Sequence, residues 1–349
     1  MPLVRKPAPS VLTSGALTPQ PGRVPRPVLS LPPSQEILFY AWTVDGTEPT
    51  SQEDLFGVMP RSGVVRRLTN EATSPDAASD RDPDWSPSHS RIVSMRATFA
   101  DPSYLTVRDS AGTVVRTIAV SGTEPIWMNA RRILTGQEGF GAGGERNRAD
   151  IVGIGMTGLV RHVTAALPGE FLSAPDWHPI AGLVATLTRE DPVTHESLGS
   201  QLVRATAAAV TTAITTGTPI PVTAMTRIGA TDTWNGFPSW SPDGASIAYV
   251  TLRPCASVEA GAPIKQPEIA IMSTIPRVRP RLVTDDSAGR YEDGLSDGSP
   301  VFSPDGQWLA WCRGYEDTWS QIVLQKLSNP STRRILVADT HWWRGGLSW

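Results

Sequence analysis

The stretch Pro238-Ser-Trp-Ser-Pro-Asp-Gly244, followed by the apolar run Ile247-Ala-Tyr-Val250, decides the fold of this chain because it recurs. Three further copies keep the same order of aromatic residue, turn and apolar run: Pro83-Asp-Trp-Ser-Pro-Ser-His89, Pro175-Asp-Trp-His-Pro179 and Pro300-Val-Phe-Ser-Pro-Asp-Gly306. A phrase that returns at intervals of roughly 40 to 60 residues is typical of a repeat architecture. The alternative is chance recurrence in a tryptophan-rich chain, and four copies in one order argue against it.

The chemistry of the phrase predicts a hairpin with a large aromatic anchor. Proline presets φ, aspartate bonds its own backbone, and glycine accepts the positive φ that closes a tight turn. The apolar run after the turn can then pair back as a strand. Two more strand-like runs follow, as in Glu268–Met272 and Arg281–Thr284 after Trp240. Four strands per repeat predict the blade of a β-propeller.

Two weaker copies, one inside the chain and one at its C-terminal end, set the number of blades. Glu124-Pro-Ile-Trp127 keeps the anchor without Ser-Pro-Asp-Gly, and Gly345-Gly-Leu-Ser-Trp349 has no strand after it. A strand-like run without an anchor lies at the other end, in Ser34–Trp42. We therefore predict an all-β, six-bladed β-propeller over residues 34–349, with four-stranded blades and a ring closed by pairing of the C-terminal strand with the N-terminal blade. The expected blade anchors are Trp85, Trp127, Trp177, Trp240, Phe302 and Trp349.

Composition excludes several classes of partner. The formal net charge is −3, which provides no basic face for nucleic acid. No apolar run approaches the roughly 18 residues that a membrane-spanning helix needs. Two cysteines in 349 residues do not make a disulfide framework. We expect a protein partner or a larger assembly, with no nucleic acid and no direct membrane span.

Residues 1–33 form a segment of different composition, with nine prolines and no repeat. Such a segment favours extended, polyproline-like conformations. It can be a disordered leader, a docking element for a partner, or a strap across the propeller itself. It lacks the apolar core of a signal peptide, which predicts a cytoplasmic location.

With these motifs in view, the chain resembles the TolB-like β-propellers. The resemblance rests on the P-x-W-S-P-D-G phrase with its apolar strand, and on a preceding strand that ends like Arg66-Arg-Leu-Thr-Asn70. It covers residues 34–349 and implies a propeller that binds partner proteins in the periplasm, with an N-terminal segment taking part. The chain departs from that family in lacking a recognisable signal peptide and the family's usual N-terminal domain. The same blades also occur in scaffolds, receptors, lyases and peptidases, so the resemblance predicts fold more firmly than function.

Catalytic motifs are weak in this sequence. Gly139-Phe-Gly-Ala-Gly-Gly144 fits G-x-G-x-x-G, but no helix is expected after it, which favours a hairpin loop. The five histidines have no spacing suited to zinc, and no G-x-S-x-G elbow is present. We predict a non-enzymatic interaction module with no catalytic residue and no cofactor. The alternative is an enzyme, a metal-dependent lyase or a hydrolase, with its site at the central channel.

Acidic residues gather in the loops that lead into the first strand of each blade. These loops share one face of a propeller, so they predict an acidic rim that attracts a basic peptide or a cation such as Ca²⁺. The rim would contain Asp76, Asp80, Asp82, Asp84, Asp232, Asp285, Asp286, Glu292, Asp293 and Asp297, of which Asp285, Asp286 and Asp293 are the candidate metal ligands. Solvated turn residues are the alternative interpretation. Trp234 and Trp319, in expected loops, are candidate interface anchors.

Overall fold

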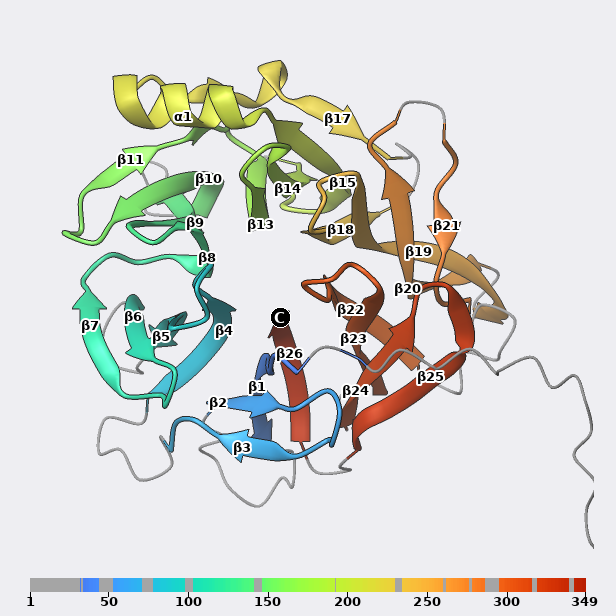
Figure 1. Cartoon of the computed structure of the whole chain (residues 1–349). Helices are drawn as coiled ribbons and strands as arrows, with labels where there is room; N and C mark the ends of the chain where they lie inside the picture. Colours follow the sequence, from blue (N-terminus) through green and yellow to red (C-terminus); the bar gives the residue numbers. More distant parts are fainter. Residues whose placement is uncertain are drawn as a thin grey trace, which may run out of the picture. The chain divides into compact units, whose positions relative to one another are not determined.

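The apolar runs of the sequence form strands (Figure 1), and the side chains of these strands are buried on both faces. In the run after Trp240, Ile247 packs against that tryptophan, whereas Ala248 belongs to a different cluster that contains Trp311. Successive side chains of a strand point to opposite faces. The two faces of such a strand therefore contact two different neighbouring sheets, which explains why the runs are apolar throughout rather than alternating.

This computed structural model describes residues 32, 34–43, 53–70, 78–97, 103–140, 146–191, 193–229, 234–259, 262–275, 278–285, 295–315, 319–338 and 342–349, all within the compact unit Pro32–Trp349. Four sheets have four strands each. The first has the order β26 (Trp342–Ser348), β1 (Ile37–Thr43), β2 (Asp54–Val58) and β3 (Val65–Arg67). The second has the order β4 (Ser79–Trp85), β5 (Arg91–Ala97), β6 (Tyr104–Asp109) and β7 (Val114–Ile118). The third has the order β18 (Asn235–Trp240), β19 (Ser246–Glu259), β20 (Ala262–Ser273) and β21 (Arg281–Leu282). The fourth has the order β22 (Leu295–Phe302), β23 (Trp308–Tyr315), β24 (Trp319–Lys326) and β25 (Asn329–Ala338).

A larger sheet combines two groups of four strands. One group is β8 (Thr123–Asn129), β9 (Arg132–Phe140), β10 (Arg146–Gly155) and β11 (Val160–His162). The other is β13 (Glu170–His178), β14 (Gly182–Glu190), β15 (Ser197–Ala205) and β17 (Thr226–Ile228). The two groups meet through one parallel pairing, Ala149 with Phe171. The short strands β12 (Thr164–Ala165) and β16 (Ile220–Pro221) pair with each other in parallel.

The two ends of the described unit lie in one sheet. β26 pairs with β1 in antiparallel register from Leu38 opposite Ser348 to Thr43 opposite Trp342. The first strands of the successive four-stranded groups contact one another in chain order, and β26 contacts both β22 and β4. The predicted pairing of the C-terminal strand with the N-terminal blade is thus present between these two strands.

The Ser-Pro-Asp-Gly turns are held by their serine and aspartate side chains. Ser241 Oγ donates to Asp243 Oδ1 at 2.6 Å and accepts from the Ser246 backbone N–H at 2.9 Å. Gly244 then has φ of +67°, which only glycine adopts without strain. In the copy that starts at Pro175, His178 takes the serine's place, because its Nδ1 accepts from the backbone N–H groups of Ile180 and Ala181.

One α-helix lies in the described residues and is an addition to the all-β fold that the sequence predicts. α1 (Ala207–Thr216) begins at Thr206, whose hydroxyl accepts from the Ala209 N–H, and ends at Gly217 with φ of +74°. Val210 and Ile214 bury its apolar side in the core of the larger sheet. A 3₁₀ turn, η2 (Val222–Ala224), follows it. No helix among the described residues has the length and apolar character to cross a membrane.

Candidate functional site

A cavity of about 1570 Å³ lies among the first strands of the four-stranded groups, where Figure 1 shows them turned toward the centre. Its walls come from β4, β8, β13, β18, β22 and β26. A cavity of this size exceeds the usual volume of a small-molecule site and has room for a peptide segment. It is the candidate functional site of the chain.

The same backbone irregularity occurs in every wall strand. The residue before the repeat's proline has φ between 45° and 50°, and the pairing with the next strand shifts register there. The residues concerned are Asp82, Glu124, Ala174, Phe237 and Ser299, with Gly346 (φ 55°) at the equivalent place in β26. Such a bulge interrupts the ladder, which suits a proline that has no N–H to donate. Positive φ in residues other than glycine is uncommon and costs energy.

Side chains from the neighbouring strand satisfy the backbone N–H groups around these bulges. Asp84 Oδ2 accepts from the Trp127 N–H at 2.7 Å, and Asp176 Oδ2 accepts from the Trp240 N–H at 2.5 Å. Ser348 Oγ does the same for the Trp85 N–H at 3.1 Å. In each case the residue after the bulge proline, or after Leu347 in β26, reaches the anchor of the following group of strands. Buried backbone N–H groups need such partners, so these bonds tie neighbouring groups together at the cavity wall.

The residue before the proline makes a second layer of such bonds. Glu124 accepts from the backbone N–H of Ala174, and Asp82 accepts from the backbone N–H of Glu124. These two carboxyls come from adjacent strands, β4 and β8, and face the same cavity. Enclosure by the protein is the main cause that raises the pKa of both, and the charge of Asp82 raises the pKa of Glu124 further.

The carboxyls after the proline also have raised pKa values. Burial in the wall raises the pKa of Asp84 to about 6 and that of Asp176 to about 7, although both accept backbone hydrogen bonds that act in the opposite direction. We call the four carboxyls of β4, β8 and β13 the acidic wall: Asp82, Asp84, Glu124 and Asp176. All four are half-buried and line the cavity. Because the strands enclose this space, carboxylates that face it are less well solvated than carboxylates on the outer surface.

The wall at β18 is aromatic instead. Phe237, at the bulge position, is 42% exposed and its ring lies 6.2 Å from that of Trp234. Trp234 lies over Gly236, because a Cβ on that glycine would come within 2.9 Å of the indole ring. An exposed phenylalanine held at positive φ is unusual for a bulky residue, and it offers an apolar contact inside the cavity.

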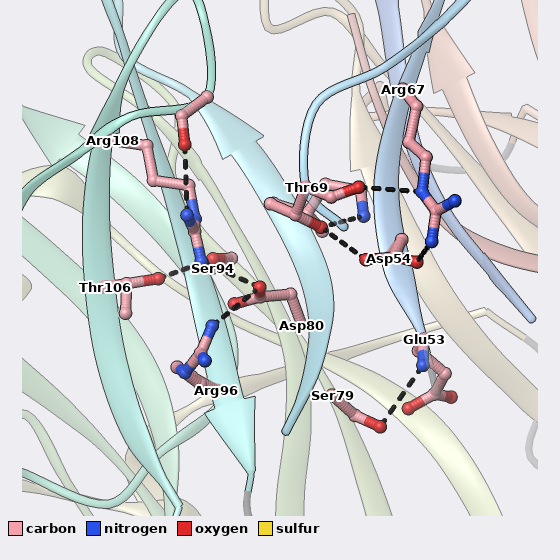
Figure 2. Close-up of polar contacts among 12 residues, drawn as sticks. Glu53, Asp54, Arg67, Thr69, Ser79, Asp80, Ser94, Arg96, Thr106 and Arg108 are labelled. Atoms are coloured by element: carbon pink, nitrogen blue, oxygen red, sulfur yellow. Dashed lines mark hydrogen bonds and ion pairs between the residues drawn. The ribbon is translucent and has the colours of Figure 1, made fainter. Parts of the chain in front are cut away.

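Two acidic residues of the predicted rim are buried in ion pairs. Figure 2 shows Asp80 between Arg96 and Arg108, with Oδ2 at 3.1 Å and 2.7 Å from their guanidinium nitrogens. Asp297 Oδ1 accepts from the Arg313 Nε–H at 2.8 Å and from the Trp311 indole N–H at 2.9 Å. Asp80 is fully buried and Asp297 is 2% exposed, so both serve the packing of their own sheets.

The polar residues of the first sheet explain the Arg-Leu-Thr strand end in the sequence. Thr69 Oγ1 accepts from the Leu55 N–H at 2.9 Å and donates to Asp54 Oδ1 at 2.9 Å, and Asp54 also pairs with Arg67 (Figure 2). Two other threonines accept a backbone hydrogen bond in the same way: Thr164 Oγ1 from the Ile151 N–H, and Thr284 Oγ1 from the Ile269 N–H. Each of these threonines therefore joins the outer edge of its group of strands to the neighbouring strand. Their role is structural.

The remaining predicted site residues are placed as follows. Asp285 is exposed, and Asp82 and Trp234 line the cavity. Asp76, Asp232, Asp286, Glu292 and Asp293 lie outside the described residues, as does the side chain of Trp319. Among the residues that the structure does describe, no group of three or more histidine, cysteine or acidic side chains is arranged to hold a metal ion. The anchors Trp85, Trp127, Trp240, Phe302 and Trp349 are buried, and Trp177 is partly buried.

Glu124, Asp176 and Phe237 are site residues that the loop composition does not indicate. They belong to the repeated phrase itself, whereas the predicted acidic rim lies in the loops. The signal was the position before the proline, which changes from one copy to the next while the proline and the anchor stay the same. Because the turn and the anchor do not require a particular side chain at this position, its side chain can contribute to a binding site.

No protein-family model and no curated protein sequence matches this chain. Several solved structures do. TolB from Acinetobacter baumannii is 16% identical with a TM-score of 0.60, over 90% of this chain and 66% of that one, so the match spans slightly less than two thirds of that protein. A protein described as TolB from Agrobacterium tumefaciens is 15% identical with a TM-score of 0.52, over 88% and 91% of the two chains. Hydrazine synthase from Kuenenia stuttgartiensis is 12% identical with a TM-score of 0.60, over 90% and 46%. At these identities the likeness describes the fold and not the function.

Proposed function

We propose that this chain, whose fold is that of a TolB-like β-propeller, is a non-enzymatic interaction module that receives a segment of a partner protein in its central cavity. The observation that carries the proposal is that one side of the cavity is acidic and another side is aromatic. Carboxyls line β4, β8 and β13, and an aromatic pair lines β18. A segment that presents a lysine or arginine to the acidic wall and an apolar side chain to Phe237 would match both.

The proposal includes an architecture for residues 34–349, namely a closed ring of six blades. Five sheets supply six four-stranded groups, because the larger sheet consists of two groups joined by the single pairing of Ala149 with Phe171. Pairing of β26 with β1 would close the ring. A ring of this kind holds its inner strands rigidly, which lowers the entropy lost when a partner binds. Residues 1–33 would be a separate tail that adds contacts to the partner.

An enzyme is the second candidate, and the acidic wall is the observation that favours it. A carboxyl whose pKa lies near neutrality, such as that of Asp176 at about 7, is suited to general acid–base catalysis. The two candidates differ in what the carboxyls do. In a binding module, substitution of a carboxyl weakens binding, whereas in an enzyme it abolishes turnover and leaves binding largely intact.

Selection of peptides on the full-length protein tests the interaction. Random 12-residue peptides displayed on phage should give binders that contain a lysine or arginine next to an aromatic or aliphatic residue. At pH 8, where both carboxyls are mostly ionised, the paired substitution of Asp82→Asn and Glu124→Gln should weaken a selected peptide about tenfold or more, which is about 1.4 kcal/mol or more, because two charges facing its cation are lost. Phe237→Ala should weaken the same peptide by a similar factor through loss of apolar contact. Kd values from isothermal titration calorimetry measure both effects.

The matched control is Asp243→Asn, because Asp243 lies in an exposed turn and not in the cavity wall. It should leave the Kd unchanged. Selected peptides that bind the cavity variants as tightly as the unaltered protein would contradict the proposed site. Hydrolysis or elimination of a bound compound that is lost in the Asp176→Asn variant would favour the enzyme.

A further inference from the structure

We propose that the acidic wall is a pH-sensitive device: loss of its negative charge on acidification stabilises the folded arrangement of the neighbouring groups of strands. The inference goes beyond the proposed function, because it concerns the folded chain itself and holds whether or not a partner binds. It rests on where the carboxyls lie: inside the cavity, and on the hydrogen bonds that join one group to the next.

The four carboxyls connect three junctions in sequence. Asp82 and Asp84 join β4 to β8, Glu124 joins β8 to β13, and Asp176 joins β13 to β18. Each bond has a backbone N–H as donor and a carboxyl oxygen as acceptor. A protonated carboxyl keeps an acceptor oxygen. Proton uptake can therefore remove the charge without breaking these bonds.

Among the described residues that line the cavity, positive groups are few beside the acidic wall. Arg81, next to Asp82, is the cation that lowers the Asp82 pKa, but its guanidinium also pairs with buried Glu53. Tyr40, on the facing strand β1, has a pKa raised far above its usual value and is neutral in this range. The other titratable side chains that line the cavity are His89, Glu138, His178, Glu190, Asp297 and Cys312. Four carboxylates in this setting repel one another and are poorly solvated, so ionising all of them destabilises the folded chain.

The direction of the pKa shifts agrees with this geometry. Enclosure by the protein raises the pKa of all four carboxyls, to about 6 for Asp84 and about 7 for Asp176. In the unfolded chain these groups titrate near pH 4. The folded chain thus binds more protons between about pH 4 and 7, and the corresponding stability is present at the acidic end and lost as the pH rises through the folded pKa values. The lowered pKa of His89 acts in the opposite direction.

Urea unfolding of the full-length protein between pH 5 and 8 tests the device. We expect the midpoint of the unaltered protein to fall as the pH rises across this range. The paired substitution of Asp176→Asn and Glu124→Gln keeps an acceptor oxygen at each position and removes both charges. It should raise the midpoint at pH 8 and flatten the dependence on pH. The dependence should not vanish, because Asp82, Asp84 and Glu53 also have raised pKa values.

The matched control is Asp191→Asn. Asp191 lies beyond the end of β14, is hydrogen-bonded to the Val193 and Thr194 N–H groups, and has a lowered pKa. Its substitution should not flatten the curve. If the paired variant and the unaltered protein depend on pH in the same way, the proposal is wrong.

A second measurement needs no variant. Potentiometric titration of the unaltered protein, native and in urea, counts the protons that each state binds. We expect the native state to hold about three more protons than the unfolded state near pH 5.5. Equal proton counts in the two states would overturn the proposal even if the paired variant does not fold.

Discussion

Deletion of residues 342–349, which form β26 and the final tryptophan, is expected to unfold the chain. The deletion leaves β1 without its partner strand and removes Trp349 from a core that contains Phe39 and Trp308. It also removes Ser348, which accepts from the Trp85 N–H and donates to Asp84 Oδ1 at 2.7 Å. The loss should exceed about 5 kcal/mol, which is comparable to the whole stability of an ordinary domain.

Circular dichroism and thermal melting of the purified truncated chain measure this effect. The point variant Trp349→Ala should lower the free energy of unfolding by less than the deletion does, because loss of a buried tryptophan alone costs about 3–5 kcal/mol. Trp349→Phe keeps an aromatic ring but loses the indole N–H bond to the Gln35 carbonyl, and it should cost less. A truncated chain that melts at the temperature of the full-length protein would show that the fold does not depend on pairing of its ends.

Substitution of Asp80 by alanine is the second large effect. Asp80 is fully buried and pairs with Arg108, which is 4% exposed, and with Arg96. Removing one member of a buried ion pair leaves the other charge poorly compensated, which typically costs about 3–5 kcal/mol. We expect Asp80→Ala to lower the free energy of unfolding by this amount, measured by urea denaturation at neutral pH.

Asp109→Ala in the same sheet is the control. The Asp109 carboxylate accepts from the backbone N–H groups of Ala111 and Thr113 in an exposed turn. Its loss should cost about 1–2 kcal/mol, because two exposed hydrogen bonds are lost. Equal destabilisation by the two substitutions would mean that the Asp80 ion pairs contribute no more than a surface turn.

The acidic residues show where sequence reasoning reached its limit. Asp80, Asp82 and Asp297 all lie near the start of a first strand, and nothing in the sequence distinguishes their roles. Asp80 and Asp297 are buried and neutralised by arginines of their own sheets, whereas Asp82 is only half-buried and lines the cavity. An arginine reaches its partner across strands, so only the packed sheet decides which carboxylate remains available to a ligand.

Sequence alone determined the all-β fold, the turns and the aromatic anchors, because these depend on neighbours within a few residues. Proline, aspartate and glycine in Ser-Pro-Asp-Gly fix a local backbone path, and the apolar run after it must be buried. The tertiary structure decided the site. Asp82 and Glu124 are 42 residues apart in the chain but line one cavity from adjacent strands. Their shared hydrogen bonding and raised pKa values arise only when the strands lie side by side and limit access of water.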